Sequence, residues 1–155
     1  MAETAIDHGT VVVERTINLT AAHVFAAYAD AGRRAAWGPP SYTAVHIYDL
    51  ANFTIRGVDH FRCGSRDDPK FQGTTFYRDI VPDSRIVSSE VIALAGNGLS
   101  AALTTLELSP HDSGTTLKMT VQVTSFMGPD IFKGHEQGYN GALDNLVRHF
   151  GGMVA

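Results

Sequence analysis

Short runs of apolar and β-branched residues alternate with turn residues through the middle of the chain. Each connection carries Gly, Pro, Asn or Asp and is short enough for a hairpin; one such turn is predicted at Gly96-Asn97-Gly98. Runs of this kind predict β-strands joined in series as an antiparallel meander. The predicted strands cover approximately residues 42–50, 53–64, 70–81, 85–94, 99–109 and 115–124.

A further strand and two short helices are predicted before the meander. The β-branched segment Thr10–Leu19 predicts the strand. Thr20 precedes a helix-forming run and is of the residue type that caps a helix N-terminus. Asp30 begins a second short helix that reaches Trp37. The segment Gly38-Pro39-Pro40 ends this helix, because proline cannot continue it.

The last segment, about residues 131–150, has helical periodicity. One apolar stripe follows the spacing i, i+4, i+7, i+8 and i+11 and consists of Tyr139, Leu143, Leu146, Val147 and Phe150. Glycine is unfavourable inside a helix, by about 1 kcal/mol relative to alanine. The glycines at 134, 138 and 141 therefore have one of two uses: they let the helix approach the sheet, or they leave room for a ligand.

These elements predict an α+β fold in one domain that spans residues 1–155, with its core at about 9–150. An antiparallel sheet has one face that must be covered, and the C-terminal helix has one apolar stripe to cover it. Strand twist curls such a sheet around the helix. A cavity between the sheet and the helix follows where the facing side chains are short.

Composition and charge narrow the functional classes. The net charge is −4 and the 12 Lys and Arg form no basic stripe, which argues against nucleic-acid binding. No apolar run approaches the about 18 residues that a membrane span needs. Cys63 is the single cysteine, so no intrachain disulfide can form, and we expect a cytoplasmic protein. The sequence predicts no cofactor and no metal site, because no fingerprint or metal-ligand spacing is present.

The ordered set of motifs resembles a known family, the bacterial proteins similar to the C-terminal domain of the activator of heat-shock-protein-90 ATPase. This family is part of the SRPBCC, or START-like, superfamily. The resemblance implies a helix-grip fold with an internal ligand cavity and covers roughly residues 9–150. The matching segments are Val12–Ile17, Ala22–Tyr28, Trp37–Pro40, Phe71–Gly73, Asp79–Val87, Gly114–Leu117 and His135–Leu146.

The third strand departs from the family pattern. The family has two glycines followed by alternating aromatic residues, and here Arg56 replaces one glycine and Asp59 replaces an aromatic residue. Strand alternation places Asp59 on the same face as Phe61 and Cys63. If Phe61 faces the cavity, Asp59 does too, and a buried carboxylate needs a partner. The alternative is that Asp59 lies at an exposed edge.

Arg78 and Glu90 form a second candidate pair. A turn at 82–84 suggests that Ile80 pairs with Ile86, which would put Phe76, Arg78 and Glu90 on the inner face. Arg78 and Glu90 would then form a buried ion pair, or Arg78 would bind a ligand carboxylate. A register that differs by one residue would instead turn both side chains to solvent.

Three functions remain open from the sequence. The first is binding of a small hydrophobic or aromatic ligand, lipid-like or polyketide-like, in the cavity. The second is a cyclase- or hydratase-like enzyme whose weak catalytic candidates are Asp59, Arg78 and Glu90. The third is a co-chaperone-like protein with a chaperone partner, and a homodimer is the default oligomer. The predicted cavity residues are Trp37, Phe61, Phe76, Arg78, Glu90, Phe126, Tyr139 and Leu143.

Overall fold

The computed structural model describes residues 5–150. One strand, two short helices, six strands and one long helix follow each other in the predicted order. They are β1 (Asp7–Ile17), α1 (Ala21–Ala29), α2 (Ala31–Trp37), β2 (Ala44–Leu50), β3 (Val58–Ser65), β4 (Asp68–Val81), β5 (Arg85–Leu94), β6 (Asn97–His111), β7 (Gly114–Ser125) and α3 (Asp130–Phe150).

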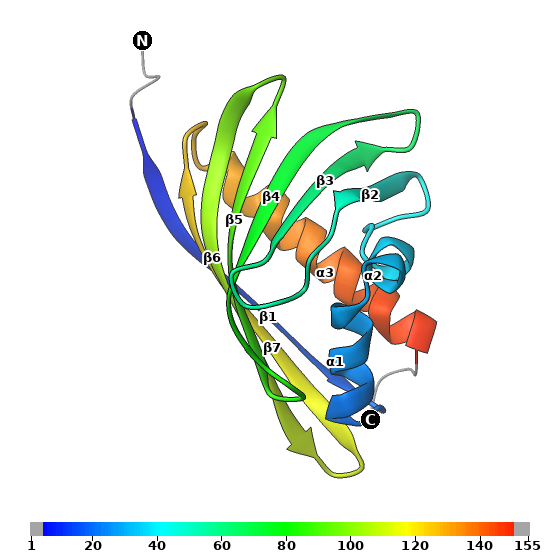
Figure 1. Ribbon diagram of the computed structural model, residues 1–155. Helices are drawn as coiled ribbons and strands as arrows, with labels where there is room; N and C mark the ends of the chain where they lie inside the picture. The colour runs from blue at the N-terminus through cyan, green and yellow to red at the C-terminus, as the bar shows by residue number, and fades with distance from the viewer. Residues whose placement is uncertain (1–4, 151–155) are drawn as a thin grey trace.

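The strands form a seven-stranded antiparallel sheet in the order β1-β7-β6-β5-β4-β3-β2. Strands β2 to β7 are neighbours in sequence, as a meander requires, and β1 joins the far edge beside β7. The sheet curves around α3, which crosses its concave side, while α1 and α2 lie near one end (Figure 1). The predicted helix-grip fold is confirmed.

Both short helices begin with the predicted caps. The Thr20 hydroxyl accepts a hydrogen bond from the His23 backbone N–H at 3.3 Å. The Asp30 carboxylate accepts one from the Arg33 N–H at 3.0 Å. Each cap satisfies a donor that the first helical turn leaves free. Because Asp30 both ends α1 and starts α2, the chain turns sharply and presents α2 to the sheet.

The start of β3 and the position of the β5–β6 turn differ from the prediction. β3 begins at Val58 and not at residue 53, because the preceding residues form a loop in which Arg56 has φ 70°. This is the left-handed region that favours glycine, which agrees with the family pattern at this position. The β5–β6 turn consists of Ala95 and Gly96, with φ values of 52° and 81°, and not of residues 96–98. Two positive φ angles in succession are typical of a type I′ hairpin turn.

The apolar core lies at one end of the sheet. Fully buried side chains there include Ile17 from β1, Leu117 and Val121 from β7, Val24 from α1 and Leu146 from α3. α3 packs mainly on β1, with further contacts to β7 and α2. Its C-terminal half therefore fills the core, and its N-terminal half extends along β2 to β6 across a cavity. Within residues 5–150, no helix is both long enough and apolar enough to cross a membrane.

Candidate functional site

A cavity of about 630 Å³ separates the inner face of the sheet from α3. This volume lies within the range of about 300–1,000 Å³ that is typical of small-molecule sites. The walls consist mostly of aromatic and aliphatic side chains from the strands, from α1 and α2, and from α3. The aromatic and apolar side chains of the wall include Tyr28, Trp37, Tyr48, Phe53, Phe61, Phe71, Tyr77, Ile86, Ile92, Leu99, Leu106, Met119, Met127, Ile131, Tyr139 and Leu143.

The glycines of α3 serve both predicted purposes. At Gly141 an added Cβ would lie 2.7 Å from the Pro40 Cβ, so this glycine lets α3 contact the segment that follows α2. At Gly134 and Gly138 an added Cβ would meet no atom within 4 Å, and both residues line the cavity. α3 therefore closes the cavity near Gly141 and leaves space towards its own N-terminus.

The loop between β7 and α3 borders the open end. Met127 lines the cavity and is nevertheless 62% exposed, so it lies at the mouth. The Ser125 hydroxyl holds the loop, since it donates to the Gly128 carbonyl at 2.6 Å and accepts from the Met127 N–H at 3.2 Å. The exposed apolar tip of this loop is Met127.

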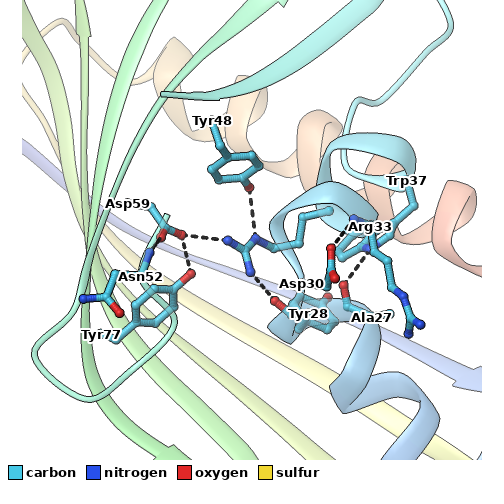
Figure 2. A network of polar contacts seen from close by, with 10 residues as sticks. Ala27, Tyr28, Asp30, Arg33, Trp37, Tyr48, Asn52, Asp59 and Tyr77 are labelled. Atoms are coloured by element: carbon cyan, nitrogen blue, oxygen red, sulfur yellow. Dashed lines mark hydrogen bonds and ion pairs between the residues drawn. The ribbon is translucent and has the colours of Figure 1, made fainter. Parts of the chain in front are cut away.

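A buried polar network lies at the α2 end of the cavity (Figure 2). Asp59 is 1% exposed and accepts three hydrogen bonds. They come from the Arg34 guanidinium at 2.9 Å, the Tyr77 hydroxyl at 2.5 Å and the Asn52 backbone N–H at 2.9 Å. The partner that an inward carboxylate requires is therefore Arg34 of α2.

Arg34 uses its remaining donors in the same network. Its Nε donates to the Tyr48 hydroxyl at 3.2 Å, and its Nη1 donates to the Tyr28 carbonyl. The guanidinium also lies 4.8 Å from the centre of the Tyr48 ring, within the range of a cation–π contact. With the Asp59 contact, these bonds occupy all three guanidinium nitrogens. The pair therefore joins α2 to β2 and β3.

Glu90 lies in the middle of β5 and faces the cavity. Its only hydrogen-bond partner among the described residues is the Tyr139 hydroxyl, which donates to Oε1 at 3.4 Å. Burial raises the pKa of this carboxyl group to about 7. The part of the Glu90 side chain that remains accessible faces the cavity, so its charge is exposed to a ligand and not to bulk water.

Two fully buried side-chain atoms of cavity-lining residues have no hydrogen-bond partner within residues 5–150. They are the Tyr28 hydroxyl and the Nδ1 of His46, and both are buried. Burial lowers the pKa of His46 to about 4, so the imidazole is neutral at pH 7. Buried polar atoms are normally paired, so these two leave hydrogen-bonding capacity unused in the wall. Within residues 5–150 no group of three or more His, Cys, Asp and Glu is placed to hold a metal ion.

The structure brings five of the predicted cavity residues together. Trp37, Phe61, Glu90, Tyr139 and Leu143 line the cavity, and three of them, Trp37, Phe61 and Leu143, are buried. Phe61 is opposite Gly73, where an added Cβ would lie 2.0 Å from the Phe61 ring, so the glycine makes room for the aromatic side chain. Asp59 also lies in the wall, so it takes the inward of the two predicted positions and not the exposed edge.

Phe76 and Arg78 lie outside the cavity, which corrects their predicted placement. Ile80 does pair with Ile86, but Arg78 is an extra residue between the pairs Tyr77–Ser88 and Asp79–Val87. This β-bulge shifts the alternation, so that Tyr77 and not Phe76 faces inward. On the outer face, Arg78 donates to the Ser89 hydroxyl at 2.9 Å and its guanidinium lies 5.3 Å from the centre of the Phe76 ring. No Arg78–Glu90 pair forms.

Phe126 also lies outside the cavity wall. Its backbone N–H donates to the Leu99 carbonyl at 2.9 Å, and its ring lies beside Gly98, where an added Cβ would be 3.5 Å from Cδ2. The ring therefore covers the β5–β6 hairpin, and the neighbouring Met127 borders the cavity instead.

Sequence reasoning missed Arg34, His46, Tyr48 and Tyr77. His46 and Tyr48 alternate along β2 in the two-residue period of an inward face, a signal that could have found them. Arg34 and Trp37 are three residues apart in a short helix and therefore share one face, which is buried. No local signal marks the bulge that turns Tyr77 inward.

A curved antiparallel sheet that closes on a long C-terminal helix around a lined cavity defines a helix-grip protein of the SRPBCC type. The protein-family model described as "Activator of Hsp90 ATPase homolog 1-like protein" matches residues 18–151. The chain therefore belongs to the family of Hsp90 ATPase activator homolog 1-like proteins. A comparison with curated proteins gave no match.

Solved structures agree with this assignment. The chain is similar to the Mll3558 protein from Rhizobium loti, with 33% identity over 94% of this chain and 99% of that one and a TM-score of 0.82. A protein from Rhizobium leguminosarum shares 26% identity over 93% and 95% of the two chains, with a TM-score of 0.79. DynU16, a protein in the dynemicin biosynthetic locus, shares the fold at 17% identity and a TM-score of 0.67, over 90% of this chain and 46% of that one.

Proposed function

We propose that the protein binds a small, largely apolar ligand, aromatic or lipid-like, in the cavity between the sheet and α3. The observation that carries the proposal is the cavity itself, about 630 Å³ in volume and lined mainly by aromatic and aliphatic side chains. Binding sites of this kind combine an apolar wall with a few fixed polar groups. Here Glu90 is such a group, since its carboxylate faces the cavity.

Two substitutions at Gly138 test the proposal. Gly138→Phe should fill the cavity, because the added side chain meets no atom near its Cβ. Gly138→Ala is the matched control, because it removes the same glycine from the helix but adds only one methyl group. Both should raise stability, by up to about 1 kcal/mol for the alanine, because glycine is a poor helix former. Loss of binding by the phenylalanine variant can then not be attributed to unfolding.

The measurement is fluorescence titration with N-phenyl-1-naphthylamine, a neutral apolar probe, combined with native mass spectrometry of the purified protein. We expect the unsubstituted protein and Gly138→Ala to bind the probe with similar affinity, and Gly138→Phe to bind at least about tenfold more weakly. A thermal shift should accompany binding, because a ligand that binds only the folded state raises its melting temperature. Equal binding by all three proteins, or by none, would rule the cavity out as the binding site.

One observation supports a second candidate function, an enzyme that uses acid–base catalysis as the cyclases do. Glu90 faces the cavity with a pKa of about 7, which suits a group that both takes up and releases protons. The carboxylate would remove a proton from a carbon next to a ligand carbonyl and return it at another position. Deuterium incorporation into enolisable ketones in D₂O, measured by mass spectrometry, tests this role. If Glu90 is the acid–base group, Glu90→Gln should abolish this incorporation of deuterium.

The location and partners of the protein remain expectations. We propose a cytoplasmic location, because the chain has a single cysteine and that residue lines the cavity. A homodimer is the default oligomer, and light scattering would measure the oligomeric state. The description of the family also suggests an activator of a chaperone ATPase, which a direct ATPase assay with added chaperone would test.

A further inference from the structure

The charged groups of the cavity are unbalanced. Arg34 is the single Lys or Arg in the wall, against the three carboxylates of Asp59, Glu90 and Asp130, counted over residues 5–150. The histidines of the wall, His46 and His135, both have pKa values lowered by burial and add no positive charge at neutral pH. The cavity and its mouth are therefore acidic.

Arg34 is not free to bind an anionic ligand. Its guanidinium donates to Asp59, Tyr48 and the Tyr28 carbonyl, and it is 8% exposed. A ligand carboxylate would have to displace Asp59 and would leave that group buried without its counter-charge. At the mouth, the N-terminus of α3 favours negative charge, but Asp130 already lies in its first turn.

Glu90 is free to bind a cation. Its Oε1 accepts one long hydrogen bond, and no second bond to the carboxylate comes from residues 5–150. Aromatic rings surround the same space: Tyr28, Trp37, Tyr48, Phe61 and Tyr139 all line the cavity. The faces of aromatic rings attract cations, and they do so more strongly where water is excluded.

We propose that the cavity selects ligands that carry a protonated amine on an apolar or aromatic body, with the amine bound to the Glu90 carboxylate. This inference rests on the proposed ligand-binding function and specifies its ligand class. A neutral ligand with a hydroxyl group would bind less tightly, because it offers Glu90 a hydrogen bond without a charge. A carboxylate on the same body would bind least, because it meets an acidic wall with no unpaired cation.

The pH dependence of amine binding follows from the groups around Glu90. The titratable groups that interact with it are Tyr139 of α3, Cys63 of β3 and Tyr48 of β2. Its cross-strand neighbours, Thr75 of β4 and Ala102 of β6, do not titrate. Burial raises the pKa of each of the three titratable groups, to about 11 for Cys63, so all three stay neutral near pH 7. Across the cavity, Arg34 and Asp59 balance each other. Amine binding should therefore follow the ionisation of Glu90 alone and become tighter between pH 6 and 8.

Three compounds with one apolar body test the inference: 2-naphthylmethylamine, 2-naphthylmethanol and 2-naphthoate. Isothermal titration calorimetry at pH 6 and pH 8 gives the affinity of each. We expect the amine to bind at least about tenfold more tightly than the alcohol at pH 8, and the carboxylate to bind most weakly. Glu90→Gln should remove the preference for the amine and change the affinity for the alcohol less than about threefold.

Glu136→Gln is the matched control, because it makes the same carboxylate-to-amide change at an exposed position of α3 outside the cavity wall and leaves Glu90 in place. It should change amine affinity no more than about twofold. If the alcohol binds but the amine is no tighter, or the amine preference survives Glu90→Gln, the inference is wrong and the binding function stands. If none of the three compounds binds the unsubstituted protein, both the inference and the binding function are overturned for this cavity.

Discussion

Removal of the Asp59 carboxylate would leave the Arg34 guanidinium buried without a counter-charge. The two side chains are 2% and 9% exposed, and their closest atoms are 2.9 Å apart. Loss of one partner of such a buried pair costs about 3–5 kcal/mol, because the remaining charge keeps its desolvation cost. Asp59→Ala should therefore lower the free energy of unfolding by about that amount, a large share of the about 5–15 kcal/mol typical of a domain. The melting temperature should fall by roughly 6–20 °C.

Urea unfolding followed by tryptophan fluorescence measures this change. Trp37 is the single tryptophan and lies in α2 beside Arg34, with its indole N–H donating to the Ala27 carbonyl at 3.1 Å. The probe therefore reports on the same corner of the fold. Asp79→Ala is the matched control, because Asp79 pairs with Arg85 across the same sheet but at the surface. Its loss should cost no more than about 1 kcal/mol.

The double variant Arg34→Met/Asp59→Leu tests the physical reason. Replacing both charges with apolar side chains removes the uncompensated charge, so the double variant should cost at least about 2 kcal/mol less than the sum of Arg34→Met and Asp59→Leu measured singly. Some cost should remain, because the Tyr77 hydroxyl and the Asn52 N–H lose their acceptor. Strict additivity, or an Asp59→Ala cost as small as that of Asp79→Ala, would refute the argument.

Two further predictions concern the cavity itself. The pKa of Glu90 is about 7 in the folded protein and near 4.5 when unfolded, so the folded state binds more protons between these pH values and stability should fall by up to about 3 kcal/mol as pH rises from about 4.5 to 7. In urea titrations at pH 8, Glu90→Gln should therefore be more stable than the unsubstituted protein. The prediction fails if the stabilities of the two proteins follow the same pH profile. Burial raises the pKa of Cys63 to about 11, so alkylation of this single cysteine by iodoacetamide at pH 7.5 should be slow, and slower still with a bound ligand. Mass spectrometry measures the rate of alkylation, and a rate equal to that of an exposed thiol would contradict the prediction.

The fold could be predicted because its signals are local. The helix caps Thr20 and Asp30 and the meander order depend on residues close together in the chain, and the structure has them as predicted. The inward position of Glu90 followed from its spacing to Ile86, which holds because β5 is regular between them. Where a strand keeps its two-residue period, the sequence is sufficient to assign its inner face.

The site was harder to predict because it depends on contacts between distant segments. Arg34 and Asp59 are 25 residues apart, and neither residue shows its partner in the sequence. The bulge at Arg78 reverses the faces of β4, and a regular alternation drawn back from Ile80 therefore put Phe76 inside in place of Tyr77. A single inserted residue has no distinctive composition, although it moves every side chain beyond it to the other face.

The buried ion pair also explains how a helix of seven residues can form one wall of a cavity. α2 has only Arg34 and Trp37 as buried side chains, too few to hold it by apolar packing alone. The Arg34 guanidinium joins it to Asp59 of β3 and Tyr48 of β2, and the Trp37 ring packs edge-on against Tyr28 at 4.8 Å between ring centres. Directional hydrogen bonds thus hold this corner without filling the space beside it. An apolar replacement for the pair would need side chains that pack together, and these would occupy part of the volume that we assign to the ligand.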